Sequence, residues 1–310
     1  MNGVLIIDKP AGLTSHDVVN RVRRILGERS VGHLGTLDPM ATGVLPLVIG
    51  NLTRLAQFYM HAEKVYEGTI RFGFATDTYD AEGEAAGPPQ PVNLNMEQVS
   101  ALAARFRGVI EQTPPPFSAK KIQGVPAYKL ARKHKEVVLK PVQVEVKEFE
   151  ILAVEVDRAT FRARVASGTY MRSIAHEMGQ IMGCGAHLEA LRRTAVAEFN
   201  LDDAHTLEQL AEAVRINSPC NSGNRSTASP EGTPETLQDL FVHPRKLLPE
   251  MPSVTADELS AARIRAGRTV NLPELSRARQ VKVFEGQREL LAIATRIAGT
   301  LFHPKIVLCG

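Results

Sequence analysis

The middle of the chain holds repeated strand-like segments without regular helices between them, and this constrains the fold more than any other feature. β-branched and aromatic residues recur in short alternations over residues 65–74, 137–156 and 160–165, as in VEVKEFEILAVEV. Alternation of this kind is typical of half-buried strands. Because the regular strand–helix–strand spacing of a doubly wound sheet is absent, the pattern predicts a mixed α+β fold.

The flanking segments predict the other elements of the N-terminal part. Residues 4–7 are apolar and predict a strand, and apolar positions on one face predict a helix from Ser15, its expected N-cap, to Gly27. Residues 31–50 have the glycines and prolines of a loop, but 44–49 are apolar enough for a buried strand. Two further helices are expected, and they cover about 170–182 and about 186–193.

Composition changes sharply near the C-terminus. Residues 217–236, NSPCNSGNRSTASPEGTPET, offer almost nothing apolar to bury and predict a disordered insert. Beyond them we expect a short helix capped by Thr255 and ending at Gly267, then strands at 280–284, 290–294 and 305–308. The sequence therefore predicts two domains, residues 1–248 and 251–310, the second of them small and β-rich.

Charge and cysteine content limit the class of protein. A chain of 310 residues with 44% hydrophobic residues can build real cores, and its net charge of +3 is too small to establish an anionic partner. The three cysteines form no CxxC pair, so reduced thiols are expected. No apolar run or leader suggests a membrane span or export, and we expect a cytoplasmic protein.

Basic residues gather in one segment and strengthen the local field, which suits a polyanionic partner, but taken alone such a segment is more often an ordinary solvated loop. They are Lys120, Lys121, Lys129, Arg132, Lys133, Lys135 and Lys140.

The segment GHLGTLDPMATGVL, residues 32–45, contains the strongest candidate for chemistry. Asp38 precedes a proline, which favours extended backbone, and nearby glycines let another chain approach closely. Taken alone, an Asp-Pro pair is more often a turn whose side chain bonds its own backbone. The stretch TDTYDAEG lacks the spacing of a calcium loop, and no metal or cofactor site is expected.

The chain resembles the bacterial tRNA pseudouridine-55 synthases, the TruB family, in four blocks. They are IIDKPAGLTSHDVV, GHLGTLDPMATGVLPLVIG, KVYEGTIRFGFATDTYDAEG, and SGTYMRSIAHEMG continued by GCGAHLEALRRTAV. The resemblance implies a mixed, mainly antiparallel catalytic sheet with flanking helices and a small C-terminal β-barrel of PUA type. It also implies cofactor-independent isomerisation of the T-loop uridine at position 55 of tRNA, which the enzyme flips out of its stack.

The same resemblance implies roles for individual residues. Asp38 is the catalytic carboxylate, Arg172 its partner and Tyr66 the ring that stacks on the uracil. The carboxylate either attacks C1′ or takes a proton from C2′, and the sequence does not choose between them. His33 wedges into the RNA loop and Leu191 lines the uracil pocket. The expected substrate-binding set is His33, Lys64, Lys120, Lys121, Tyr128, Lys129, Arg132 and Leu191.

The same resemblance implies that two further regions of the chain contact tRNA. The basic segment at about 118–140 resembles a thumb that closes on the tRNA T stem-loop, and the C-terminal module would reach the acceptor stem. A monomer is expected. The alternatives are an RNA-binding protein or tRNA folding chaperone without essential catalysis and, less favoured, a synthase acting at guide-directed ribosomal RNA sites. A glycoside hydrolase is disfavoured because no second catalytic carboxylate is evident.

Overall fold

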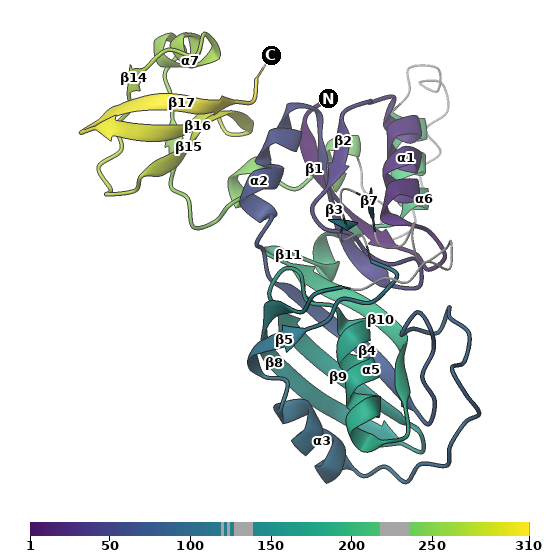
Figure 1. Cartoon of the computed structure of the whole chain (residues 1–310). Helices are drawn as coiled ribbons and strands as arrows, with labels where there is room; N and C mark the ends of the chain where they lie inside the picture. The colour runs from purple at the N-terminus through teal and green to yellow at the C-terminus, as the bar shows by residue number, and fades with distance from the viewer. Residues whose placement is uncertain (119–120, 123–124, 127–138, 218–235, 310) are drawn as a thin grey trace.

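The structure is a computed structural model of the chain, and it describes residues 1–118, 121–122, 125–126, 139–217 and 236–309 (Figure 1). Of residues 121–122 and 125–126 it describes the backbone alone. Most of the expected thumb and nearly all of the expected disordered insert, 217–236, lie outside the described residues. Among the described residues, no helix is long and apolar enough to cross a membrane.

One large sheet of ten strands organises the N-terminal part of the chain. The order along the sheet is β12-β1-β3-β10-β4-β9-β8-β5, with β2 beside β3 and β11 beside β10. The bounds are β1 Gly3–Lys9, β2 Val31–His33, β3 Thr42–Ile49, β4 Lys64–Phe72, β5 Gly108–Gln112, β8 Val142–Glu155, β9 Arg158–Val165, β10 Ala186–Val196, β11 Phe199–Asn200 and β12 Ala204–His205. The described β1–β12 and β3–β10 pairs are parallel and the other pairs in this sheet are antiparallel. The predicted fold class is therefore confirmed.

Helices cover one face of this sheet. They are α1 Ser15–Leu26, α3 Met96–Ala104, α5 Met171–Met182 and α6 Leu207–Ile216. In Figure 1, α1 and α6 lie beside the β1–β3 end, and α5 and α3 lie over the β10–β8 end. The alternation of strand side chains separates two cores, because Leu5 and Ile7 of β1 pack with these helices whereas Val4 and Ile6 point to the opposite face.

A second sheet packs against that opposite face. Its order is β13-β15-β16-β17-β14, and the bounds are β13 Ser253–Thr255, β14 Val270–Asn271, β15 Gln280–Glu285, β16 Glu289–Ala298 and β17 Leu301–Val307. Phe284, Ile293 and Ile306 of this sheet share a core with Val4 and Val44 of the large one. The short elements η1 Gly50–Leu55, α2 Ala56–Tyr59 and η5 Pro244–Lys246 lie near this junction, and α7 Glu258–Arg265 covers the second sheet. The short element η4 Leu237–Leu240 lies on the helix-covered face, beside α6. The remaining short elements are β6 Lys121–Ile122, β7 Val125–Pro126 and η2 Leu201–Asp203.

The helix predicted over 186–193 is wrong, because these residues lie in β10. The segment is rich in alanine, leucine, glutamate and arginine, which favour helix when only local propensity acts. Here β10 pairs with β4 over its whole length and with β3 at Arg192 and Arg193. Irregularities between Leu188 and Ala190 and between Arg193 and Ala195 interrupt the strand alternation in the sequence.

Two predicted helix caps are also corrected. Helix α1 begins at Ser15, but Thr14 is its N-cap and accepts from the Asp17 amide in a capping box. Ser15 instead exchanges two hydrogen bonds with the Leu37 backbone. Helix α7 is capped by Asp257 and ends at Arg265, while Thr255 belongs to β13.

Gly43 marks the closest approach of two strands at the start of β3. Its φ is +100°, and a Cβ added there would lie 2.2 Å from the carbonyl oxygen of Arg193. Gly12 also has a positive φ, +81°, but a Cβ there would meet nothing within 4 Å. An alanine at Gly12 would therefore introduce backbone strain alone, whereas an alanine at Gly43 would introduce both strain and a steric clash.

We expect Gly43→Ala to lower the free energy of unfolding by about 2–4 kcal/mol, because strain and overpacking add. Gly12→Ala, which adds strain alone, should cost about 1–2 kcal/mol. Urea unfolding followed by circular dichroism measures both. Equal losses in the two variants would show that the β3–β10 contact tolerates a methyl group.

Candidate active site

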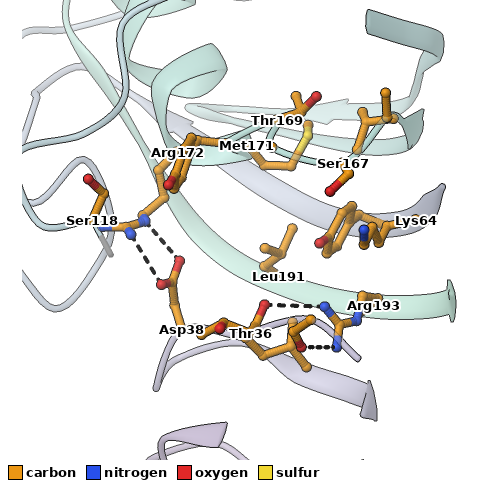
Figure 2. A pocket seen from close by; sticks show the side chains of 17 residues that line it. Thr36, Asp38, Lys64, Ser118, Ser167, Thr169, Met171, Arg172, Leu191 and Arg193 are labelled. Carbon is orange, nitrogen blue, oxygen red and sulfur yellow. Dashed lines mark hydrogen bonds and ion pairs between the residues drawn. The ribbon is translucent and has the colours of Figure 1, made fainter. Parts of the chain in front are cut away.

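A pocket of about 250 Å³ opens where four segments of the large sheet region and Ser118 meet. It is small beside the roughly 300–1,000 Å³ of pockets for drug-sized ligands. Figure 2 shows side chains from the 35–38 loop, β4, the 165–172 segment and β10 around it. The residues that line it are Gly35, Thr36, Leu37, Asp38, Lys64, Tyr66, Ser118, Val165, Ala166, Ser167, Gly168, Thr169, Tyr170, Met171, Arg172, Leu191 and Arg193.

The buried guanidinium of Arg172 lies between two carboxylates. Its Nη2 donates to Oδ1 of Asp38 at 3.1 Å, and its Nε lies 2.9 Å from Oδ2 of the same residue. On the other side Nη1 lies 3.2 Å from Oδ2 of Asp80. The Arg172 and Asp80 side chains are 5% and 4% exposed, whereas that of Asp38 remains 36% exposed. Asp38 is therefore the carboxylate of the three-residue cluster that is open to a ligand.

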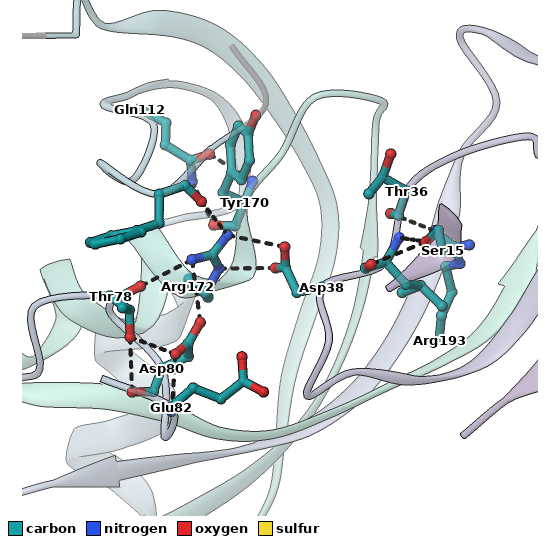
Figure 3. A network of polar contacts seen from close by, with 12 residues as sticks. Ser15, Thr36, Asp38, Thr78, Asp80, Glu82, Gln112, Tyr170, Arg172 and Arg193 are labelled. Atoms are coloured by element: carbon teal, nitrogen blue, oxygen red, sulfur yellow. Dashed lines mark hydrogen bonds and ion pairs between the residues drawn. The ribbon is translucent and has the colours of Figure 1, made fainter. Parts of the chain in front are cut away.

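Asp80 is held in place independently of Arg172. Its Oδ1 accepts from the Thr78 hydroxyl at 2.5 Å and from the Glu82 amide at 3.1 Å (Figure 3). The same loop is fastened to β10, because the Leu188 amide donates to the Tyr79 carbonyl and the Ala81 amide to the Leu188 carbonyl. A fixed Asp80 in turn fixes the orientation of Arg172.

The first turn of α5 is anchored from β5. Gln112 is buried, and its side-chain amide both accepts from the Tyr170 amide and donates to the Tyr170 carbonyl (Figure 3). The Ser173 hydroxyl donates to the Thr113 carbonyl. The N-terminus of α5 has no side-chain cap, and these contacts take the place of one. They also fix the position of Arg172, in the first turn of α5, relative to the pocket.

In the loop that carries Asp38, the backbone of nearly every residue next to Asp38 forms a hydrogen bond with another part of the chain. Arg193 donates to the carbonyls of Gly35 and Thr36, and Ser15 bonds both polar groups of Leu37. The ammonium of Lys9 and the amide of Gly12 both reach the Pro39 carbonyl. The backbone on both sides of Asp38 is therefore rigidly placed, which suits a group that must meet a reacting atom.

Burial raises the pKa of the Asp38 carboxyl above its ordinary value. Arg172 opposes this shift and Asp80 adds to it, because one guanidinium faces two carboxylates. Burial also lowers the pKa of His33, with a further contribution from the positive charge of Arg193, which favours the neutral imidazole.

The structure brings five of the expected site residues to one pocket: Asp38, Tyr66, Arg172, Lys64 and Leu191. His33 lies at the end of β2, half-buried, where its Nδ1 accepts from the Gly35 amide just outside the lining. The side chains of Lys120, Lys121, Tyr128, Lys129 and Arg132 fall outside the described residues. Among the described residues, no cluster of His, Cys, Asp or Glu side chains is arranged to hold a metal ion.

Sequence reasoning missed Asp80 and Arg193. Asp80 lies in TDTYDAEG, which we considered for calcium and not as a partner for an arginine 92 positions away. Arg193 is fully buried and Arg192 is half-buried and paired with Asp8. Had residues 186–193 been assigned to a strand, its alternation would have placed one of these two arginines inside.

We expect Asp80→Asn to lower the pKa of Asp38, because Arg172 then compensates a single carboxylate. Arg172→Met should raise it, since burial is then unopposed by the guanidinium. The pKa is read from ¹³C chemical shifts of aspartate-labelled protein, with Asp38→Asn to assign the resonance. Asp157→Asn is the control, because Asp157 pairs with Arg71 and Arg158. A rise after Asp80→Asn would contradict the proposed sharing of charge.

Comparison with known proteins identifies the family. The model of the TruB family pseudouridylate synthase N-terminal domain matches residues 23–171, and that of the tRNA pseudouridylate synthase B C-terminal domain matches residues 172–223. Proteins named tRNA pseudouridine synthase B from Solibacter usitatus (strain Ellin6076) and Aquifex aeolicus (strain VF5) are 49% and 37% identical, each covering 99% of this chain and 100% of the relative.

Solved structures support the same fold. A chain in the crystal structure of a Cbf5-Nop10-Gar1 complex superposes with a TM-score of 0.67 at 25% identity, over 96% of this chain and 79% of that chain. One in an H/ACA RNP bound to a substrate RNA containing 2′-deoxyuridine has a TM-score of 0.70 at 23% identity, over 99% and 85%. The match along the full length of its relatives and the pocket at Asp38 lead to one conclusion: the chain belongs to the TruB family of pseudouridylate synthases, enzymes that isomerise uridine in RNA to pseudouridine.

Proposed function

We propose that this chain isomerises the uridine at position 55, in the T loop of tRNA, and that Asp38 is the catalytic carboxylate. The observation that carries the proposal is the half-open Asp38 side chain, paired with the buried Arg172 at the wall of a pocket of about 250 Å³. The tRNA substrate is supported by the names of relatives that align along the whole chain. A uridine in a folded loop must leave its stack to enter such a pocket.

The geometry explains how Asp38 serves the reaction. The bond from ribose C1′ to uracil N1 breaks, and the base turns and rejoins the ribose through C5, so no redox partner is consumed. A carboxylate that attacks C1′, or takes the proton from C2′, must be ionised and shielded from water. Arg172 favours the ionised form, and the tightly bonded loop holds the carboxylate at one position.

Tyr66 and Leu191 form the apolar part of the proposed uracil site. Both line the pocket, from neighbouring strands β4 and β10, whose registers pair Leu191 with Gly68 and Tyr66 with Arg193. The aromatic ring offers a face for stacking on the base. His33 lies at the end of β2, where burial lowers its pKa, and would fill the gap that the flipped uridine leaves in the RNA.

Contacts beyond the pocket complete the proposal. We assign residues 1–248 to a catalytic domain and 251–310 to a PUA-like domain that contacts the acceptor stem through its five-stranded sheet. The segment at about 118–140, with Lys120, Lys121, Tyr128, Lys129 and Arg132, would close on the T stem-loop by phosphate contacts. We propose a monomer that acts in the cytoplasm.

Asp38→Asn should abolish product while leaving tRNA affinity largely unchanged. The substitution is nearly isosteric, and Arg172 keeps its contact with Asp80, so its charge stays paired. We expect a loss of turnover on the order of 10⁴-fold or more. Tritium release from C5 of labelled uridine in an unmodified tRNA transcript measures turnover, and filter binding measures affinity.

The controls separate this proposal from its alternatives. The lost label must map to the T-loop uridine, and activity on a free stem-loop without any guide RNA excludes a guide-directed site. Retained turnover by Asp38→Asn would refute the catalytic assignment. A properly folded wild-type chain that binds tRNA without releasing tritium would favour an RNA-binding or chaperone function.

Tyr66→Phe tests whether the hydroxyl helps to move the C5 proton. The ring and its stacking remain, so RNA affinity should change little, while proton transfer should slow by about 10²-fold. Single-turnover tritium release measures the effect, and Tyr66→Leu, which also loses the ring, should weaken binding as well. A wild-type rate for Tyr66→Phe would restrict the role of this residue to stacking.

A further inference from the structure

Two cationic side chains that line the pocket form no ion pair with Asp38. Lys64 is 8% exposed and Arg193 is fully buried, and both line the pocket. Figure 2 shows them on the other side of Leu191 from Arg172. Neither is within ion-pair distance of an acidic side chain of the described residues. This end of the pocket therefore carries positive charge without a counterion among the described residues.

The donors of Lys64 are unusually free for a buried lysine. An ammonium group has three N–H donors. Lys9 uses its ammonium on the carbonyls of Pro10, Leu13 and Pro39, and Lys282 donates to those of Arg245 and Leu247. Lys64 donates to the Ala62 carbonyl, at 2.6 Å, and to no other group of the described residues. Within the described part of the chain, two of its three donors are therefore left for a ligand.

Arg193 contributes charge, and three of its five N–H donors are already used on backbone carbonyls. Its Nε, Nη1 and Nη2 donate to the carbonyls of Val44, Thr36 and Gly35. Burial and this neighbouring guanidinium together lower the pKa of Lys64 to about 8, because no acidic side chain of the described residues offsets them. An anion beside Lys64 would remove that penalty, whereas a neutral carbonyl would leave most of it.

The position of Lys64 indicates which anion it meets. Lys64 and Tyr66 are two residues apart on β4 and line the same pocket, so a base stacked on Tyr66 brings its own backbone close to Lys64. We propose that Lys64 binds a non-bridging oxygen of the phosphodiester next to the flipped uridine, with Arg193 strengthening the field. This inference rests on the proposed function and divides the pocket into a catalytic end at Asp38 and an anion end at Lys64.

The test measures whether Lys64 and one phosphodiester act as a pair. Binding of T stem-loops is measured in the Asp38→Asn protein to prevent turnover, with and without Lys64→Met. One RNA is natural, and two carry a single uncharged methylphosphonate linkage, on the 5′ or the 3′ side of the target uridine. We expect one of these linkages to weaken binding on the order of 30-fold with Lys64 present, and to have little further effect in Lys64→Met.

Salt dependence provides a second readout. Lys64→Met should reduce the slope of log affinity against log salt by about 0.7, the value for one phosphate contact on a single strand, whereas Lys64→Arg should keep it. Lys246→Met is the matched control, because it also removes one positive charge but from an exposed lysine outside the pocket. Its affinity loss should be equal for all three RNAs.

Three outcomes would overturn the inference. One is that neither methylphosphonate weakens binding to the protein that retains Lys64, a measurement that does not depend on whether Lys64→Met folds. The second is equal loss from Lys64→Met on all three RNAs, as expected for a contact to a uracil carbonyl. The third is no loss from Lys64→Met at all. Turnover of the natural stem-loop by the unaltered chain tests the proposed function separately.

Discussion

The arrangement of the pocket depends on one buried guanidinium. Arg172 contacts Asp38 and Asp80 and also donates to the backbone carbonyls of Thr78 and Phe117, so the loops that carry these residues converge on a single side chain. Burying a charge is costly unless it is paired and hydrogen-bonded. Two carboxylates satisfy Arg172, but they leave the cluster one negative charge in excess. Burial raises the pKa of Asp38, the member with the most exposed side chain, while Arg172 opposes that rise and Asp80 adds to it.

A second feature of the site is that buried cationic side chains donate hydrogen bonds to the backbone carbonyls of the Asp38 loop. Lys9 and Arg193 donate to backbone oxygens on both sides of Asp38, at Pro39 and at Gly35 and Thr36. These contacts cross from β1 and β10 to the same loop, so the large sheet itself sets the position of the Asp38 carboxylate. The close β3–β10 approach at Gly43 belongs to the same arrangement, because Arg193 lies on the strand that Gly43 contacts.

Charge divides the pocket into two ends. At one end a guanidinium is matched by carboxylates, and at the other Lys64 and Arg193 have no acidic partner among the described residues. A flipped nucleotide has a matching polarity, since its sugar and base are neutral and its phosphodiesters are anionic. The proposed orientation of the substrate follows from that match, with C1′ near Asp38 and a phosphate near Lys64.

The sequence by itself determined the α+β class through its strand-like alternation, and it indicated the pairing of Asp38 with Arg172 and the pocket residues Tyr66, Lys64 and Leu191 through the resemblance of contiguous blocks to a known family. Tertiary structure alone decided that residues 186–196 form a strand, since pairing with β3 and β4 outweighs the helical propensity of alanine, leucine and arginine. It also decided that Asp80 shares Arg172 and that Arg193 supports the Asp38 loop. Those contacts join residues 92 and more than 150 positions apart, and local patterns hold no record of which distant charge a buried arginine will meet.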